Sequence, residues 1–217
     1  MKDNSINNVF TGWLARWTLF SCFGLAAGIA LALSVADPVE KLVGMMLVTP
    51  VVLFVAGIVL GGSQWLAIWR LHRKGFAWIV ATGIAVGIGM TLGIVVVEIV
   101  GRAITGTQMR LFGGSAITRT ISLLVIGLFT GLSVGVSQWV VMRQQLRGSN
   151  WILLTTLAFT IGFPSGALAA GLVPGGLLNI MGFGLFVSIT GFIVGVVTAL
   201  PARRIERSLS ARLTSLD

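Results

Sequence analysis

Two glutamines and one threonine are the residues of this 217-residue chain whose types and spacing best suit a site. Gln64 and Gln138 each complete the pattern G-x-x-x-G-x-x-Q within an apolar run, and Thr198 takes the place of the glutamine in a third copy. Polar side chains inside an apolar span usually face neighbouring helices or a water-filled cavity. Two interpretations stay open: a polar intramembrane site, or hydrogen bonds between packed helices, which the pattern favours.

Residues that support catalysis do not accompany these side chains. His72 stands in a basic segment without nearby cysteine, histidine or acidic residues, so a metal site lacks ligands. The sequence contains no Ser/His/acid set, phosphate-binding loop or dinucleotide fingerprint. Glu98 is the only acid in a predicted span, and Arg102, four residues later, is a sufficient partner for it. We therefore expect no catalytic residues, no metal and no cofactor.

The elements that must position these side chains are transmembrane helices. The chain is 56% hydrophobic and 10% charged, whereas soluble domains have about 25% charged residues. A helix needs roughly 20 apolar residues to cross a bilayer, and six stretches meet this length: about 13–35, 43–68, 77–99, 119–142, 151–172 and 176–201. The sequence thus predicts an all-α polytopic membrane protein that forms a single transmembrane domain over residues 1–217.

Lysines and arginines are unevenly divided between the two ends of these spans. Eleven fall on the side of the termini and four on the other side, and by the positive-inside rule both termini are cytoplasmic. This bias accounts for the net charge of +9, so we expect no nucleic-acid partner. The expected location is the bacterial cytoplasmic (plasma) membrane, as a multi-pass protein.

All seven tryptophans fall at the predicted cytoplasmic ends of spans. Because indole prefers the headgroup level, we expect an interfacial belt that contacts lipid headgroups together with nearby basic residues. The alternative is that the basic residues reflect orientation alone. The residues assigned to the belt are Trp13, Trp65, Trp78, Trp139, Trp151, Arg70, Arg73, Lys74 and Arg143.

Glycine spacing indicates an internal repeat. In the odd-numbered spans two glycines follow Trp13, Trp78 and Trp151 at offsets of 11 and 15 residues, and the even-numbered spans carry G-x-x-x-G. The sequence predicts three parallel two-helix hairpins, over about 13–72, 77–147 and 151–207, packed through these glycines. The glycines are Gly24, Gly28, Gly57, Gly61, Gly89, Gly93, Gly131, Gly135, Gly162, Gly166, Gly191 and Gly195.

The string G-x-x-x-G-x-x-Q-W occurs at 57–65 and 131–139, and each copy is followed by basic residues and then by the tryptophan of the next span. In this respect the chain resembles an uncharacterised class of Gly-rich bacterial repeat membrane proteins. The resemblance covers most of the chain and implies its architecture, but that class has no assigned activity.

One span contains a sequence at which a helix can break or kink. In Ile161–Gly166 (IGFPSG), Pro164 removes a backbone hydrogen bond and the glycines soften the remainder. A broken helix with Ser165 and Asn179 as polar lining stands beside a simple kink as an interpretation of this stretch.

Three functions from different classes remain. We favour a non-catalytic structural or accessory subunit of a membrane complex, whose partners are membrane lipids and either other membrane subunits or further copies of itself. A small-solute transporter or channel subunit is the first alternative, because the size and span count fit. A lipid- or quinone-binding protein that uses the tryptophan belt and the basic rim is the second.

Overall fold

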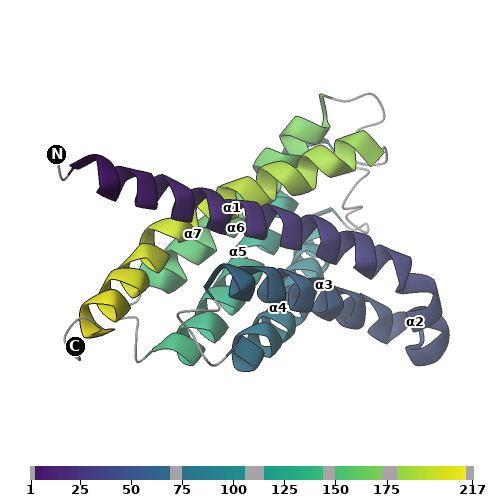
Figure 1. Cartoon of the computed structure of the whole chain (residues 1–217). Coiled ribbons are helices and arrows are strands. Elements are labelled where there is room, and N and C mark those ends of the chain that lie inside the picture. Colours follow the sequence, from purple (N-terminus) through teal and green to yellow (C-terminus); the bar gives the residue numbers. More distant parts are fainter. Residues whose placement is uncertain (1–2, 69–74, 106–114, 144–149, 173–179, 214–217) are drawn as a thin grey trace.

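The computed structural model describes residues 3–68, 75–105, 115–143, 150–172 and 180–213, and these residues are almost entirely α-helical (Figure 1). Six helices are long and apolar enough to cross a membrane, so the prediction of an all-α protein with six spans is confirmed at this level. The helices are α1 (Asp3–Ser34), α2 (Ala36–Val43), α3 (Met45–Ile68), α4 (Gly75–Thr105), α5 (Ala116–Met142), α6 (Asn150–Ala170) and α7 (Ile180–Leu213).

Helix α2 is an extra element between the first two spans. Its eight residues, ADPVEKLV, include no buried side chain. It ends at Gly44, whose backbone N–H donates to the Glu40 carbonyl and whose φ is 79°, a conformation that glycine adopts without steric cost. Acidic residues in this stretch signalled a connection, but the short helix itself was not anticipated.

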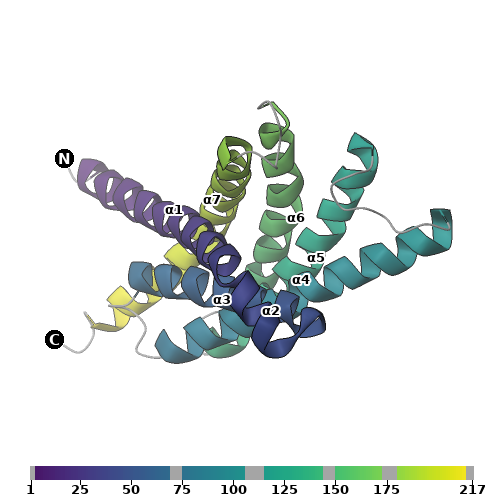
Figure 2. The ribbon, with the colours of Figure 1, turned by 90° about the vertical axis from the view of Figure 1, so that its right-hand side faces the viewer.

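The six long helices form a closed ring of neighbours. Each packs against the helices before and after it in the chain, and α7 returns to pack against α1, over the residues that the structure describes. Helix α1 begins and α7 ends on the same side of the molecule in both views (Figures 1 and 2). Helix α7 continues past its apolar part, Met181–Ala199, as far as Leu213.

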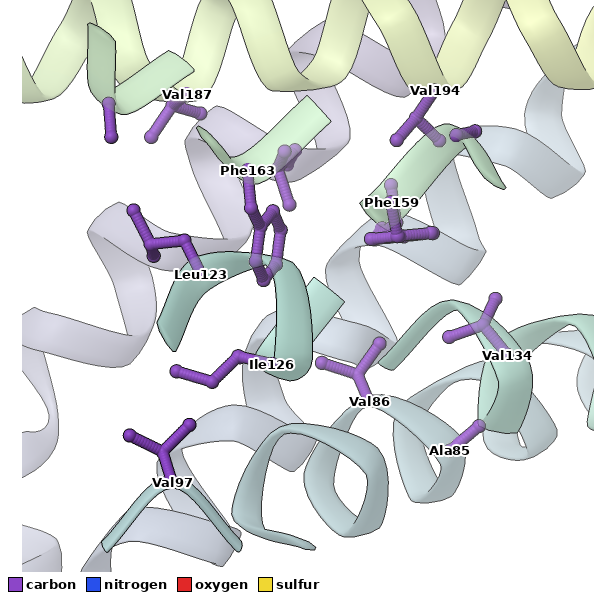
Figure 3. Packing of buried hydrophobic residues seen from close by; sticks show 14 residues of the cluster. Ala85, Val86, Val97, Leu123, Ile126, Val134, Phe159, Phe163, Val187 and Val194 are labelled. Carbon is purple, nitrogen blue, oxygen red and sulfur yellow. The ribbon is translucent and has the colours of Figure 1, made fainter. Parts of the chain in front are cut away.

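Apolar side chains from all six long helices fill the interior of this ring. Figure 3 shows Phe159 and Phe163 of α6 between residues of the neighbouring helices. Large apolar side chains such as Leu19, Phe23 and Leu92 lie on the outside and are exposed, as expected where lipid tails replace water. Since lipid is as apolar as leucine, close packing rather than the hydrophobic effect holds such helices together.

Of the two interpretations of the fifth span, the broken helix is wrong. Helix α6 runs without a break from Asn150 to Ala170, and Pro164 is buried within it. The Thr190 hydroxyl of α7 donates to the Gly162 carbonyl at 3.0 Å, which illustrates how neighbouring helices satisfy backbone groups close to a proline. Ser165 is half-buried, and Asn179 lies outside the described residues.

Candidate functional site

The structure brings the two predicted glutamines together. The Gln138 side-chain Nε2 donates to Gln64 Oε1 at 3.0 Å and to Thr82 Oγ1 at 3.1 Å. Both glutamine side chains are almost fully buried, at 3% and 2% exposure. These two bonds use both protons of the Gln138 amide group, so its donors are fully satisfied.

The bond between the two glutamines crosses the interior of the ring, whereas the bond to Thr82 joins the neighbouring helices α5 and α4. Gln64 lies on α3 and Gln138 on α5, and α4 packs between those two helices. The glycines that precede the glutamines allow this reach: a Cβ atom on Gly61 would lie 3.1 Å from Ile79 Cα, and one on Gly135 would lie 3.0 Å from Ile152 Cα. Because the helix backbones approach this closely, the side chains of Gln64 and Gln138, three residues after these glycines, extend into the interior of the ring.

Thr198, the third predicted member, belongs to the same layer but has different partners. Its Oγ1 accepts a hydrogen bond from the Trp17 indole Nε1 at 2.9 Å and donates to the Val194 carbonyl at 2.6 Å. Thr198 is buried at 2% exposure. The structure thus links it to α1 and gives no bond between it and the two glutamines.

Three tryptophans meet at one end of the ring interior. The Trp151 ring contacts Trp17 with a centroid distance of 6.3 Å and Trp78 with one of 6.0 Å, both edge to face. Such pairs contribute about 0.5–1.5 kcal/mol beyond their burial. None of the three indoles exceeds 1% exposure. We call Trp17, Trp78 and Trp151 the indole trio.

The prediction of an interfacial belt is therefore wrong for Trp78 and Trp151. An indole without exposed surface does not contact lipid headgroups, and both lie inside the bundle because their side of the helix faces the ring interior. Trp65 and Trp139 are half-buried against the same cluster. The Trp13 side chain lies outside the part of the chain whose side chains are described.

A hydroxyl residue follows each member of the indole trio by four positions: Ser21, Thr82 and Thr155. Residues four apart lie on one face of a helix, so these hydroxyls form the next layer inward, together with the glutamines. All three are buried at 0–1% exposure. Sequence reasoning missed them, although the recurring W-x-x-x-[S/T] spacing was a usable signal.

Only part of this polar layer is internally satisfied. Thr82 accepts from Gln138 and its hydroxyl donates to the Trp78 carbonyl at 2.9 Å. Four atoms of the indole trio and of the hydroxyls that follow it have no hydrogen-bond partner within the described residues: Ser21 Oγ, Thr155 Oγ1, Trp78 Nε1 and Trp151 Nε1. The same holds for Thr18 Oγ1, Trp139 Nε1 and Arg119 Nε outside this set. Each such group costs about 1–3 kcal/mol when it is left dry.

The predicted glycines lie at the contacts between neighbouring helices. A Cβ atom on Gly93 would lie 2.7 Å from Ile126 Cα, within the α4–α5 pair. One on Gly131 would lie 2.7 Å from Thr156 Cα, between α5 and α6, and one on Gly195 would lie 2.7 Å from Thr18 Cα, where α7 closes on α1. Side chains larger than hydrogen do not fit at these separations.

Basic residues at this end of the bundle are only partly described. Arg16 Nη2 donates to the Ala67 carbonyl at 2.8 Å, which ties α1 to the last turn of α3, where a cation is favoured. Arg143 is exposed at the end of α5. Arg70, Arg73 and Lys74 lie outside the described residues.

The remaining polar side chains of interest lie near the opposite end. Glu98 and Arg102 of α4 form an ion pair one helical turn apart, with both side chains largely exposed. Within the described ranges, no three residues among His, Cys, Asp and Glu come together as metal ligands.

Comparison of the chain with protein-family models, with curated proteins and with solved structures finds no match in any of the three.

Proposed function

We propose that this chain is a non-catalytic integral protein of the bacterial cytoplasmic membrane that serves as a structural or accessory subunit of a membrane complex. The observation that carries the proposal is the closed ring whose interior is filled by side chains of all six long helices. Such a body is rigid, because a packed interior transmits strain and deforms little. Rigidity suits a subunit that supports partners through its apolar outer surface.

The organisation that we propose is three parallel hairpins. It is supported by an equivalent contact inside each hairpin. A Cβ atom on a glycine of the first helix would meet the residue that precedes the G-x-x-x-G of the second helix. The contacts are Gly28 with Ala56, Gly89 with Thr130 and Gly162 with Thr190. Eleven residues before these glycines stand Trp17, Trp78 and Trp151. The first copy of the repeat is thus better aligned on Trp17 than on Trp13.

The same alignment relates the contacts between hairpins. Gly57 meets Gly83, Gly131 meets Thr156, and Gly191 meets Cys22, so the second helix of each hairpin packs on the first helix of the next one. The last of these contacts closes the ring. Because the small-residue faces are used within the chain, we expect partners to bind through the larger apolar side chains outside. The resemblance to Gly-rich bacterial repeat membrane proteins fits this organisation and stays a proposal.

The test is extraction from the native membrane into lipid nanodiscs without detergent, followed by mass measurement of the purified particles. A structural or accessory subunit emerges with a constant ratio of a second membrane protein or of further copies of itself. Particles that hold one copy alone, from cells whose uptake of a small solute changes on deletion of the gene, contradict the proposal and favour the transporter.

Small-solute binding is the second candidate, and one observation favours it: the four buried polar atoms of the central layer that have no partner in the described residues. The lipid- or quinone-binding alternative is weaker than the sequence implied. It relied on the tryptophan belt, and Trp78 and Trp151 lie in the bundle interior.

A further inference from the structure

We propose that the polar layer beneath the indole trio is a buried binding site for a small uncharged hydrogen-bond acceptor of about the size of water. The site is formed by Trp78, Trp151, Ser21 and Thr155. This inference goes beyond the proposed structural role and does not depend on the transporter alternative, so the two can fail separately.

The four polar groups differ in whether they donate or accept hydrogen bonds. An indole N–H only donates, whereas a serine or threonine hydroxyl both donates and accepts. The set therefore presents two obligatory donors and two adaptable groups, and its natural ligand has accepting lone pairs. A buried water makes about two to four hydrogen bonds to groups that are otherwise unsatisfied, which matches the number available here.

The proposed site is built around the ring contacts among the three tryptophans. Trp78 and Trp151 are in ring contact at 6.0 Å, and Trp151 also contacts Trp17 at 6.3 Å. Thr155 lies one helical turn after Trp151, and Ser21 lies one turn after Trp17, each on the same helix face as its tryptophan. The four residues of the proposed site are therefore members of the indole trio or lie one helical turn from one.

The charge of the side chains in this layer decides which class of ligand the site favours. The residues of this layer, including Gln64, Gln138 and Thr198, are all uncharged. Transferring a bare ion into a low-dielectric interior is far more costly than transferring a neutral polar molecule, and nothing in the layer carries a compensating charge. A neutral ligand is therefore favoured over a halide or an alkali cation.

The hydroxyls of Ser21 and Thr155 are not paired with carbonyls of their own helices. Threonines in this bundle commonly donate to the carbonyl four residues earlier, as Thr82 does to Trp78 and Thr130 does to Ile126. Ser21 and Thr155 do not, although the carbonyls of Trp17 and Trp151 stand at that position. Their orientation leaves the hydroxyls free for a ligand.

The test uses the full chain, labelled with ¹⁵N-tryptophan, in lipid nanodiscs. Magnetisation transfer from water to the indole N–H protons is measured by NMR, and single Trp→Phe variants assign the signals. We expect cross-peaks from water at Trp78 and Trp151, and none at Trp17, whose N–H is bonded to Thr198. Trp17 is thus an internal control of equal burial. Absence of the cross-peaks at both Trp78 and Trp151 overturns the proposal.

A stability comparison gives an independent result that does not need these assignments. In a dry layer, Thr155→Val removes an unsatisfied buried hydroxyl and raises the melting temperature. With a ligand bound to that hydroxyl, the same change lowers the melting temperature by a few degrees and removes the water cross-peaks. The matched control is Thr82→Val, whose hydroxyl is already bonded within the chain and whose loss leaves the cross-peaks in place.

A second arm separates resident water from an exchanging solute, with formamide as the probe. Saturable shifts of the Trp78 and Trp151 indole signals on addition of formamide, lost in Thr155→Val, assign the site to solute binding. Water cross-peaks without a formamide response assign it to resident water. Either outcome supports the buried site, but only the first also supports the transporter.

Discussion

Gln64 and Gln138 form a coupled pair, and their coupling is measurable as a departure from additivity. Gln138→Leu removes two interhelical hydrogen bonds, which are worth about 0.6 kcal/mol each in membrane bundles. It also leaves Gln64 Oε1 without its donor, and an abandoned buried group costs about 1–3 kcal/mol. The expected destabilisation is about 2–4 kcal/mol.

The partner change has a similar cost. Gln64→Leu removes one of these bonds and leaves one Gln138 proton unpaired, so we expect a loss of about 2–3 kcal/mol. The double variant contains no abandoned amide, because both partners are replaced by apolar side chains of similar size. It should lose only about 1 kcal/mol, which is less than either single change.

The assay is a double-mutant cycle on the free energy of unfolding in lipid bicelles, followed by circular dichroism. We expect the double variant to be more stable than the sum of the single effects predicts, by about 3–6 kcal/mol. A control cycle combines Gln138→Leu with Thr190→Val, because Thr190 bonds to Gly162 elsewhere in the bundle. Additivity within about 0.5 kcal/mol in both cycles would refute the idea that the amides act as a unit.

Three further changes test other parts of the structure. Gly131→Ala introduces a Cβ atom 2.7 Å from Thr156 Cα and should destabilise the bundle by about 1–3 kcal/mol, whereas Gly62→Ala meets nothing within 4 Å and should be neutral or stabilising in the same melt. Thr198→Val leaves the buried Trp17 N–H without its acceptor, so it should cost about 1–3 kcal/mol and shift the Trp17 indole proton in NMR; an unchanged shift contradicts the bond. The orientation of the chain in the membrane is tested with Arg143→Cys in a Cys22→Ala background. This cysteine should react with an impermeant maleimide only after the cells are permeabilised, and labelling of intact cells would contradict the proposed topology.

The number and extent of the spans were predictable because the membrane leaves the backbone little choice. Every N–H and C=O in the hydrocarbon region must be paired within the chain, so an apolar run of sufficient length becomes a helix. The same rule fits the continuity of α6 through Pro164, which lacks the N–H that would donate to the Thr160 carbonyl but lies buried among helices.

The positions of the tryptophans were harder to predict, because depth and helix face are separate variables. All seven tryptophans fall near one end of the predicted spans in the sequence, and that depth alone suggests contact with headgroups. Helix periodicity adds the missing direction: Trp17, Ser21 and Gly28 lie on one face of α1, while Leu19 and Phe23 are exposed on another. Polar and small residues at helical spacing after a tryptophan therefore indicate an indole that points inward.

The glutamine pair shows what spacing alone leaves undetermined. Both residues end the same motif, and the motif places them at one depth. Whether they meet depends on how α3, α4 and α5 follow each other around the ring, which is a tertiary property. Thr82 contributes a partner that the G-x-x-x-G-x-x-Q motif does not contain, so it was not identifiable from that pattern.

The third copy of the repeat departs from the other two, and its departure has a structural consequence. Thr198 stands where the others have glutamine, and it accepts the Trp17 N–H, whereas Trp78 and Trp151 have no such acceptor within the described residues. A short side chain with a hydroxyl thus satisfies its tryptophan, while the longer amides turn instead toward each other across the ring. This substitution gives the Trp17 N–H an acceptor, so the unpaired indole donors of the trio are those of Trp78 and Trp151, and Ser21 Oγ on α1 also has no partner within the described residues. An asymmetric site within a nearly symmetric bundle follows from this single replacement, and restoring the glutamine with Thr198→Gln should release the Trp17 N–H and extend the water cross-peaks to all three indoles.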